Sequence, residues 1–293
     1  METRTRTSAV RAIAIAALAS FGVAALGTIT WGPLIVANLG LTPAIPWAVP
    51  AEGLALALIW AWLGGRWRPA RWSGARRRLL RSRMVSPAAF AWAAVAGALS
   101  LVGLAGFWIV LVRMTGAGGN PTLPSAAAYP AIAVVAVILG ASLVSPLTEE
   151  AAFRGYGQVL LERRFPPVAA VALSSLFFAL YHGPTQGFQP SKIAFYFTVG
   201  VVFGTIAYLT GSVLPAIPVH VAADLLFFTA IWPQDAGRTL VWTHGADPGF
   251  WLNVAQTLVF AGLALLAFRR LRAVTRTAAA TATAHCALAP EGR

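Results

Sequence analysis

Charged side chains are scarce in this chain of 293 residues. They make up 11% of it, whereas soluble globular domains contain about 25%. Apolar residues make up 58%, and they gather in runs long enough to cross about 30 Å of hydrocarbon as helix. This composition excludes a soluble globular protein and predicts a polytopic membrane protein.

Cysteine and lysine occur once each. Because Cys286 is the single cysteine, disulfide bonds within the chain and cysteine-based metal sites are excluded. Because lysine is so rare, arginine supplies nearly all of the basic residues behind the net charge of +13. Such a charge is common in nucleic-acid-binding proteins, but here the arginines lie between apolar runs. We therefore predict no nucleic-acid partner.

The apolar runs predict an all-α integral membrane bundle of about eight transmembrane helices. The first run follows several arginines and resembles a signal peptide, but its length and the runs after it favour a retained helix. The predicted runs cover residues 10–29, 46–63, 88–112, 128–147, 167–182, 192–211, 213–231 and 250–268.

The segment from Arg66 to Arg83 is rich in arginine and separates the second and third runs. The positive-inside rule places such a segment in the cytoplasm. With eight crossings both termini are then cytoplasmic as well, in agreement with the arginines near both ends of the chain. The excess of arginine over lysine is typical of a GC-rich bacterial genome, so we expect a multi-pass protein of the bacterial cytoplasmic membrane, in contact with the lipid bilayer.

Few ionisable side chains fall within the apolar runs. Placing a charged side chain at bilayer depth costs several kcal/mol of free energy, so each of these residues is a candidate for a functional site. Glu52 lies near the outer start of the second run, where we expect a structural or interfacial role. The others form three short patterns and are Glu149, Glu150, Arg154, His182, His220 and Asp224.

The first pattern, EEAAFR, begins at Glu149. Glu150 and Arg154 are spaced i, i+4 on a helix, which predicts an ion pair, and Glu149 is rotated by about 100° from that pair. Two adjacent glutamates can also form a solvated first turn of a helix. Pro146 and Thr148, which can start or kink a helix inside an apolar region, favour a functional role.

The second pattern places Phe178 and His182 on one helix face, and the sequence Gly183-Pro184 predicts a helix end just beyond them. A capping or packing histidine is the alternative to a functional one. The third pattern places His220 and Asp224 on one face. If Pro218 is the first helical residue, His220 lies in the first turn, where the helix dipole favours a neutral imidazole. A mutually satisfied polar pair inside a bundle is the alternative here.

The three patterns can meet only if they lie at similar depths. If one long kinked helix covers about residues 129–164, its midpoint is close to Glu149. The run 213–231 has its middle between His220 and Asp224, and His182 lies roughly 9 Å to the outer side of the midplane. We therefore expect these groups to converge within the membrane, unless the fourth helix stops near Leu147.

A carboxylate and two histidines at one point could activate a water for attack on a peptide carbonyl, with or without a metal ion. Glu149 would be the base. The motifs HExxH, GxGD and GxSG do not occur in the sequence. No serine or cysteine is placed as an obvious nucleophile beside a histidine, so we do not expect an acyl-enzyme.

These motifs resemble those of the CPBP family, which comprises type II CAAX prenyl endopeptidases and bacterial bacteriocin-processing or self-immunity proteins. EEAAFR matches EExxxR, Phe178 to His182 matches FxxxH, and His220 to Asp224 matches HxxxN/D. The resemblance covers about residues 128–232. It implies that Glu149 and His182 activate the water, and that His220 with Asp224 completes the site or stabilises the oxyanion.

The resemblance also implies supporting roles for Phe178 and for the ion pair of Glu150 with Arg154. The prenyl endopeptidases more often carry asparagine at the position of Asp224. A carboxylate there would repel an oxyanion unless it is protonated or bound to a metal. This departure favours a divalent cation such as zinc, for which the candidate ligands are Glu149, His182, His220 and Asp224.

We therefore predict an intramembrane endopeptidase that acts on a hydrophobic or membrane-anchored peptide or protein, in CAAX-type or bacteriocin and self-immunity processing. The alternatives are a non-catalytic membrane scaffold or immunity protein and a proton-coupled transporter, although we find no internal repeat of the kind common in transporters. The predicted organisation is amino-terminal helices with the arginine-rich loop (1–127), a catalytic helical core (128–232), an outer loop and last span (233–274), and a disordered tail (275–293).

Overall fold

The computed structural model describes residues 8–119 and 129–288, and the side chains up to residue 277. This part of the chain is helical and contains no strand. Within it, seven helices are long and apolar enough to cross a membrane. They are Ala9–Leu41 (α1), Pro87–Thr115 (α4), Ala131–Glu162 (α5 to α6), Pro167–Gln186 (α7), Pro190–Thr210 (α8), Ala216–Gly237 (α9 and the turns after it) and Pro248–Thr277 (within α11). The predicted all-α polytopic membrane bundle is confirmed.

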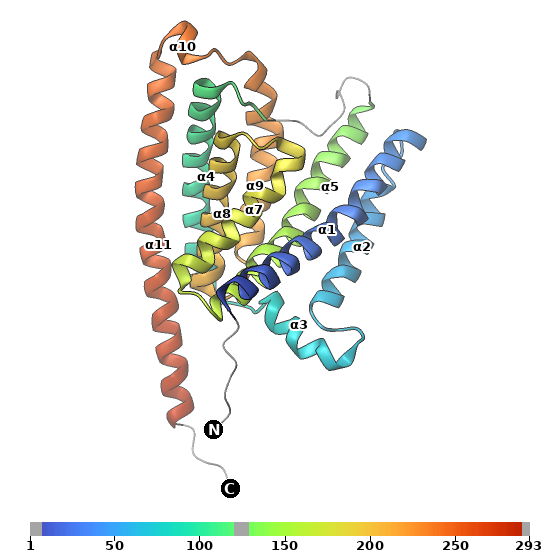
Figure 1. Cartoon of the computed structure of the whole chain (residues 1–293), viewed down its shortest axis with the longest axis vertical. Helices are drawn as coiled ribbons and strands as arrows, with labels where there is room; N and C mark the ends of the chain where they lie inside the picture. Colours follow the sequence, from blue (N-terminus) through green and yellow to red (C-terminus); the bar gives the residue numbers. More distant parts are fainter. Residues whose placement is uncertain (1–7, 120–128, 289–293) are drawn as a thin grey trace.

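The second apolar run forms a shorter helix, α2, over Ala48–Leu63. At about 1.5 Å per residue its 16 residues extend about 24 Å, less than the roughly 30 Å of a hydrocarbon core. It packs against α1 and α5, and Figure 1 shows α1 and α2 side by side. Residues 8–119 and 129–288 therefore contain seven long helices and one short apolar helix where about eight spans are predicted.

Proline begins several of the long helices and glycine ends some of them. Proline suits the first helical position because its missing N–H would have no partner there and its φ is already helical. Glycine after the last turn adopts the left-handed conformation without a steric penalty. The prolines are Pro87, Pro167, Pro190 and Pro248, and the glycines are Gly116 (φ 73°) and Gly211 (φ 62°).

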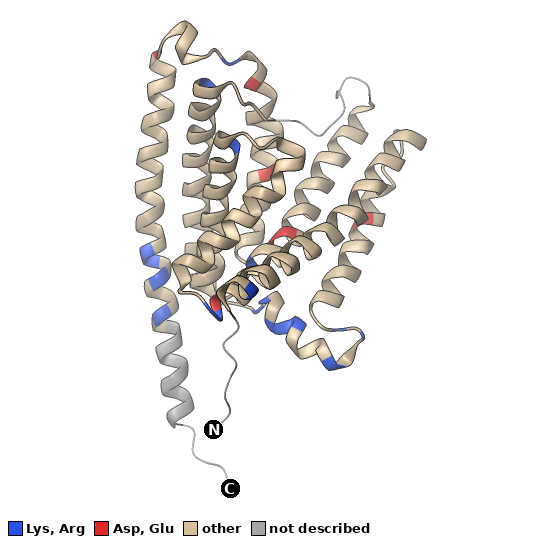
Figure 2. Cartoon of the chain, viewed as in Figure 1, with Lys and Arg blue, Asp and Glu red and all other residues tan. Residues whose placement is uncertain are grey.

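One end of the bundle carries much of the positive charge. Figure 1 places the start of α1, the short helix α3 (Ser73–Leu80) and the end of α11 (Pro248–Leu288) at this end. Figure 2 shows basic residues on both α3 and α11 there. This arrangement agrees with an even number of passes, and the cytoplasmic location of this end stays a prediction.

The structure differs from the predicted helix ends near both histidines. Helix α7 continues through Gly183 and Pro184 to Gln186, because a proline two residues before the end removes one hydrogen bond from an already fraying turn. Helix α9 (Ala216–Leu226) begins two residues before Pro218. His220 is thus the fifth helical residue rather than a first-turn residue, which weakens the helix-dipole argument.

The carboxyl-terminal region also differs from prediction. A disordered tail is predicted from residue 275, whereas α11 continues to Leu288. The segment is rich in alanine, the best helix former, and it extends an existing helix, so it needs no new nucleation. Residues 289–293 of the predicted tail, and the predicted domain boundary between residues 127 and 128, lie outside the described residues.

Candidate active site

A long interrupted helix positions the two adjacent glutamates. Helix α5 (Ala131–Glu149) continues without a break into a π-helical segment, Glu150–Gly157, and then into α6 (Gln158–Glu162). Glu149 therefore lies in the interior of one membrane-length helix rather than at the end of one that stops near Leu147. The helix changes from α to π at the junction of Glu149 and Glu150, and such π-helical turns are frequent at functional sites.

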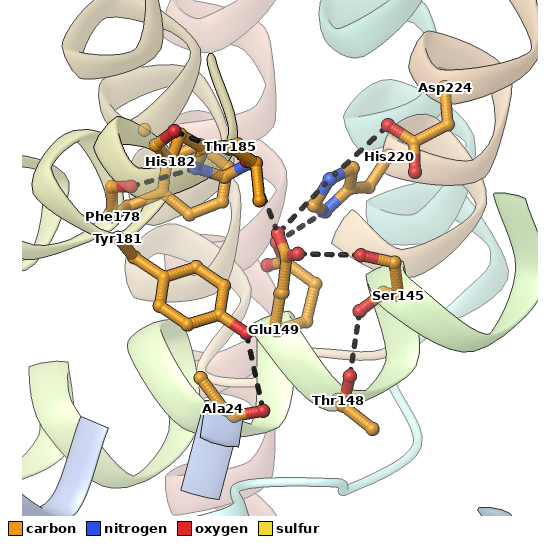
Figure 3. A network of polar contacts seen from close by, with 12 residues as sticks. Ala24, Ser145, Thr148, Glu149, Phe178, Tyr181, His182, Thr185, His220 and Asp224 are labelled. Atoms are coloured by element: carbon orange, nitrogen blue, oxygen red, sulfur yellow. Dashed lines mark hydrogen bonds and ion pairs between the residues drawn. The ribbon is translucent and has the colours of Figure 1, made fainter. Parts of the chain in front are cut away.

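Glu149 points into the space between two histidines from other helices (Figure 3). Its Oε2 atom lies 3.8 Å from Nε2 of His182 on α7 and 3.7 Å from Nε2 of His220 on α9. Ser145, one turn earlier on α5, donates its hydroxyl to the other oxygen, Oε1, at 2.5 Å. Glu149 is only 6% exposed, and Oε2 is buried without a hydrogen-bond partner. The free oxygen of this carboxylate thus faces both imidazoles.

The orientation of His182 is set by its own helix. Nδ1 lies 2.8 Å from the carbonyl oxygen of Phe178. Because a carbonyl only accepts hydrogen bonds, Nδ1 carries the proton and donates it. In the neutral ring Nε2 is then an acceptor that faces Glu149. The ring also packs against Phe178, with centroids 4.4 Å apart, and stacks on Tyr196 at 4.1 Å.

His220 is held between carboxylates. Its Nδ1 lies 2.9 Å from Oε1 of Glu150, and its Nε2 lies 3.7 Å from both Oε2 of Glu149 and Oδ1 of Asp224. The ring stacks on Phe203, with centroids 4.5 Å apart. A carboxylate at Nδ1 favours a proton on that nitrogen and leaves Nε2 directed toward Glu149 and Asp224.

Arg154 lies in the apolar interior beside Glu150. Its Nη1 is 3.3 Å from Oε1 of Glu150, the i, i+4 contact expected from the spacing, and both side chains are fully buried. The guanidinium lies over the ring of Phe178, 4.1 Å from its centroid, and close to Phe203. Aromatic faces attract a cation. The ion pair and these rings therefore form a layer behind the two histidines.

The described side chains are not spaced as metal ligands. Two ligands of a tetrahedral zinc ion are about 3.3 Å apart when each bond is about 2.0–2.1 Å. The nitrogen-to-oxygen distances from Glu149 to His182 and His220 are longer, 3.8 and 3.7 Å. No group of three or more His, Cys, Asp or Glu side chains in the described part of the chain is arranged to hold a metal ion. The predicted zinc site does not fit this spacing.

The sequence patterns missed three hydroxyl-bearing side chains around Glu149. Ser145 is four residues before Glu149, and this spacing could have identified it. Tyr181 precedes His182, and its hydroxyl donates to the carbonyl oxygen of Ala24 at 3.3 Å. Tyr196 comes from α8, a neighbouring long helix without a motif, so no local pattern could have placed it.

Glu52 does not join this site. It is 2% exposed on α2, and its Oε1 atom has no hydrogen-bond partner. A Cβ atom at Gly140 of α5 would lie 2.7 Å from its Oε2 atom, so the missing side chain of this glycine makes room for the carboxylate. The location agrees with the structural or interfacial role expected from the sequence.

Comparison with known proteins adds to this geometry. The family model described as Type II CAAX prenyl endopeptidase Rce1-like matches residues 131–226. The matched segment runs from the first residue of α5 to the last residue of α9 and so contains all three motifs. No curated protein and no solved structure matches the chain. The match of residues 131–226 to this model supports the assignment of the chain to the CPBP family of intramembrane proteases.

Proposed function

We propose that the chain hydrolyses peptide bonds in hydrophobic or membrane-tethered substrates and that Glu149 is the general base. The family match supports intramembrane endopeptidase activity. The observation that carries the mechanism is the buried Oε2 atom of Glu149, which lies within 3.8 Å of Nε2 of both His182 and His220. Oε2 of Glu149 and Nε2 of neutral His182 are acceptors that face each other, which favours a molecule that donates hydrogen bonds, and water is the smallest.

The proposed reaction starts from a water hydrogen-bonded to Glu149 and His182. As the water oxygen bonds to the peptide carbonyl carbon, Glu149 takes one of its protons and the carbonyl π electrons move to the carbonyl oxygen. The tetrahedral intermediate then collapses and the C–N bond breaks. The proton held by Glu149 passes to the leaving nitrogen, so one peptide bond and one water become one carboxylic acid and one amine.

The residues around this centre position the reacting groups. Glu150 holds Nδ1 of His220, and the carbonyl of Phe178 holds Nδ1 of His182. Arg154 supplies the counter-charge to Glu150 inside the protein. Groups held in this way need little reorganisation when the water attacks. We assign Glu150, Arg154 and Phe178 to this supporting role.

We propose a substrate that reaches the site from the membrane. Glu149 and His220 are buried on helices that are long and apolar enough to span it. A hydrophobic or lipid-anchored segment partitions into the same region, whereas the transfer of a soluble peptide into it costs free energy. CAAX-type processing and the processing of a bacteriocin or self-immunity protein both supply such substrates, and residues 128–232 form the proposed catalytic core.

The test compares cells that express the wild type, Glu149→Gln or Glu52→Gln at matched levels, in a bacterial host whose related protease gene is deleted. New amino termini in the membrane proteome are measured. We expect new fragments with the wild type and with Glu52→Gln, which changes a buried carboxylate outside the site, and none with Glu149→Gln. Equal fragment profiles for wild type and Glu149→Gln would exclude the mechanism and favour a scaffold or carrier.

A further inference from the structure

Tyr196 carries a buried hydroxyl that the mechanism above does not use. The residue is 6% exposed, and its hydroxyl is buried without a hydrogen-bond partner. Buried polar groups in native proteins almost always have a partner, and leaving one unpaired is unfavourable. A phenylalanine at this position would pack as well and avoid that cost, so packing alone does not explain the hydroxyl.

The ring of Tyr196 lies directly against the candidate site. It stacks on the imidazole of His182, with centroids 4.1 Å apart and planes 17° apart. Phe178 and Phe195 pack against its edge at 6.4 and 5.6 Å. The histidine that carries this stack lies with its Nε2 3.8 Å from Oε2 of Glu149. The hydroxyl is therefore held beside the cluster by a rigid aromatic stack.

The side chains that surround Glu149 supply mainly acceptors. Oε2 of Glu149 accepts hydrogen bonds, and so does Nε2 of neutral His182, because Nδ1 of that ring donates to the carbonyl of Phe178. The hydroxyls of Ser145 and Tyr181 are already engaged, by Glu149 and by the carbonyl of Ala24. A tetrahedral intermediate needs a donor for its oxyanion, and Asp224 can be that donor only in its protonated form.

We propose that the Tyr196 hydroxyl is a catalytic hydrogen-bond donor to the oxyanion of the tetrahedral intermediate. This inference rests on the proposed function. When water adds to the peptide carbonyl, the carbonyl π electrons become a lone pair on oxygen. The phenol O–H donates a hydrogen bond to that oxygen and keeps its proton throughout. When the C–N bond breaks, the electron pair returns to re-form the carbonyl, so Tyr196 is unchanged at the end of the cycle.

The test uses the full-length protein reconstituted in phospholipid vesicles, with a synthetic peptide that spans the most abundant cleavage site found by comparing wild type with Glu149→Gln. Tyr196→Phe removes the hydroxyl and keeps the stacking ring. Tyr208→Phe is the matched control, because it is the same change on the same helix at a residue that is 40% exposed. We expect kcat to fall about 100-fold in Tyr196→Phe, with KM within twofold, and to stay unchanged in Tyr208→Phe.

A kcat of Tyr196→Phe within twofold of the wild type would overturn the inference. It would leave the proposed function intact, provided that Glu149→Gln is inactive. If the wild type cleaves nothing, it is the proposed function that fails. Should Tyr196→Phe not fold, 3-fluorotyrosine at position 196 keeps the ring and gives a more acidic phenol. The alkaline limb of the kcat–pH profile should then move to lower pH, and an unmoved limb would contradict the donor role.

Discussion

Oε1 of Glu150 lies 2.9 Å from Nδ1 of His220. The next residue toward the amino terminus, Glu149, faces the other nitrogen of the same ring at 3.7 Å. Two adjacent carboxylates thus contact opposite nitrogens of one imidazole, which is possible because successive residues of a helix point in different directions. One glutamate orients the ring and the other shares the reaction centre with it.

Glu150→Gln should lower kcat by at least about 10-fold, because a neutral amide holds the Nδ1 proton of His220 less strongly than a carboxylate does. KM should change little, since Glu150 is fully buried behind the histidine. Steady-state kinetics in vesicles would check this. A raised KM with an unchanged kcat would show that Glu150 shapes substrate binding instead.

Arg154→Ala should destabilise the protein by about 3–5 kcal/mol, because it leaves Glu150 buried without its counter-charge. Thermal unfolding in detergent measures the effect. The exposed Arg163→Ala is the control. The double variant Glu150→Leu with Arg154→Met should be less destabilised than Arg154→Ala, since it leaves no unpaired charge. Equal unfolding temperatures for wild type and Arg154→Ala would refute the ion-pair role.

Gly200→Ala should lower stability by about 1–3 kcal/mol. A Cβ atom there would lie 2.8 Å from Cα of Ser175, so α7 and α8 would have to move apart. The carbonyl of Gly200 also accepts from Nη2 of Arg154 at 3.4 Å, which couples this crossing to the layer behind the site. Gly262→Ala on α11, where a Cβ atom would meet nothing within 4 Å, should show no such loss.

Cleavage should be insensitive to chelation if Glu149 acts on the water without a metal. Incubation of the purified wild type with EDTA, followed by removal of the chelator, should leave kcat within twofold of untreated protein. The unfolding temperature should also be unchanged, because the proposed site does not need a bound ion to keep its structure. A loss of activity that added Zn²⁺ restores would show that the four site residues rearrange to bind a metal.

Asp247 provides a pH-dependent contact outside the membrane-spanning segments. Its hydrogen bond with Arg113 lowers the pKa of the carboxyl from its ordinary value of 3.8, and the backbone N–H of Phe250 acts in the same direction. A lowered pKa in the folded state means that the stabilisation is present above pH 3.8 and is lost as the pH falls through the folded-state value.

Asp247→Asn, which keeps a helix-capping side chain at the start of α11, should therefore unfold at a lower temperature than the wild type at pH 7. The difference should shrink toward zero as the pH is lowered below the ordinary aspartate value. Differential scanning fluorimetry across this range would check it. A difference that is the same at every pH would assign the effect to capping rather than to charge.

Much of the membrane architecture follows from local sequence. Long apolar runs predict helices because every backbone group must be paired inside lipid, and arginine-rich segments predict which elements share one end. The i, i+4 spacing of Glu150 and Arg154 predicts their contact, since helix geometry sets it. Helix ends were less predictable. Gly183-Pro184 does not stop α7, because a proline two residues before the helix end removes only one hydrogen bond from the last turn.

By itself the sequence determined the helical class, the apolar spans and the three motifs, because these depend on composition and on spacing within one helix. Only the tertiary structure decided that Glu149 faces His182 and His220, that one long helix passes through the site, and that Tyr196 stacks on His182. These contacts join four helices, and their distances depend on how the helices pack. No periodicity within a single segment contains that information.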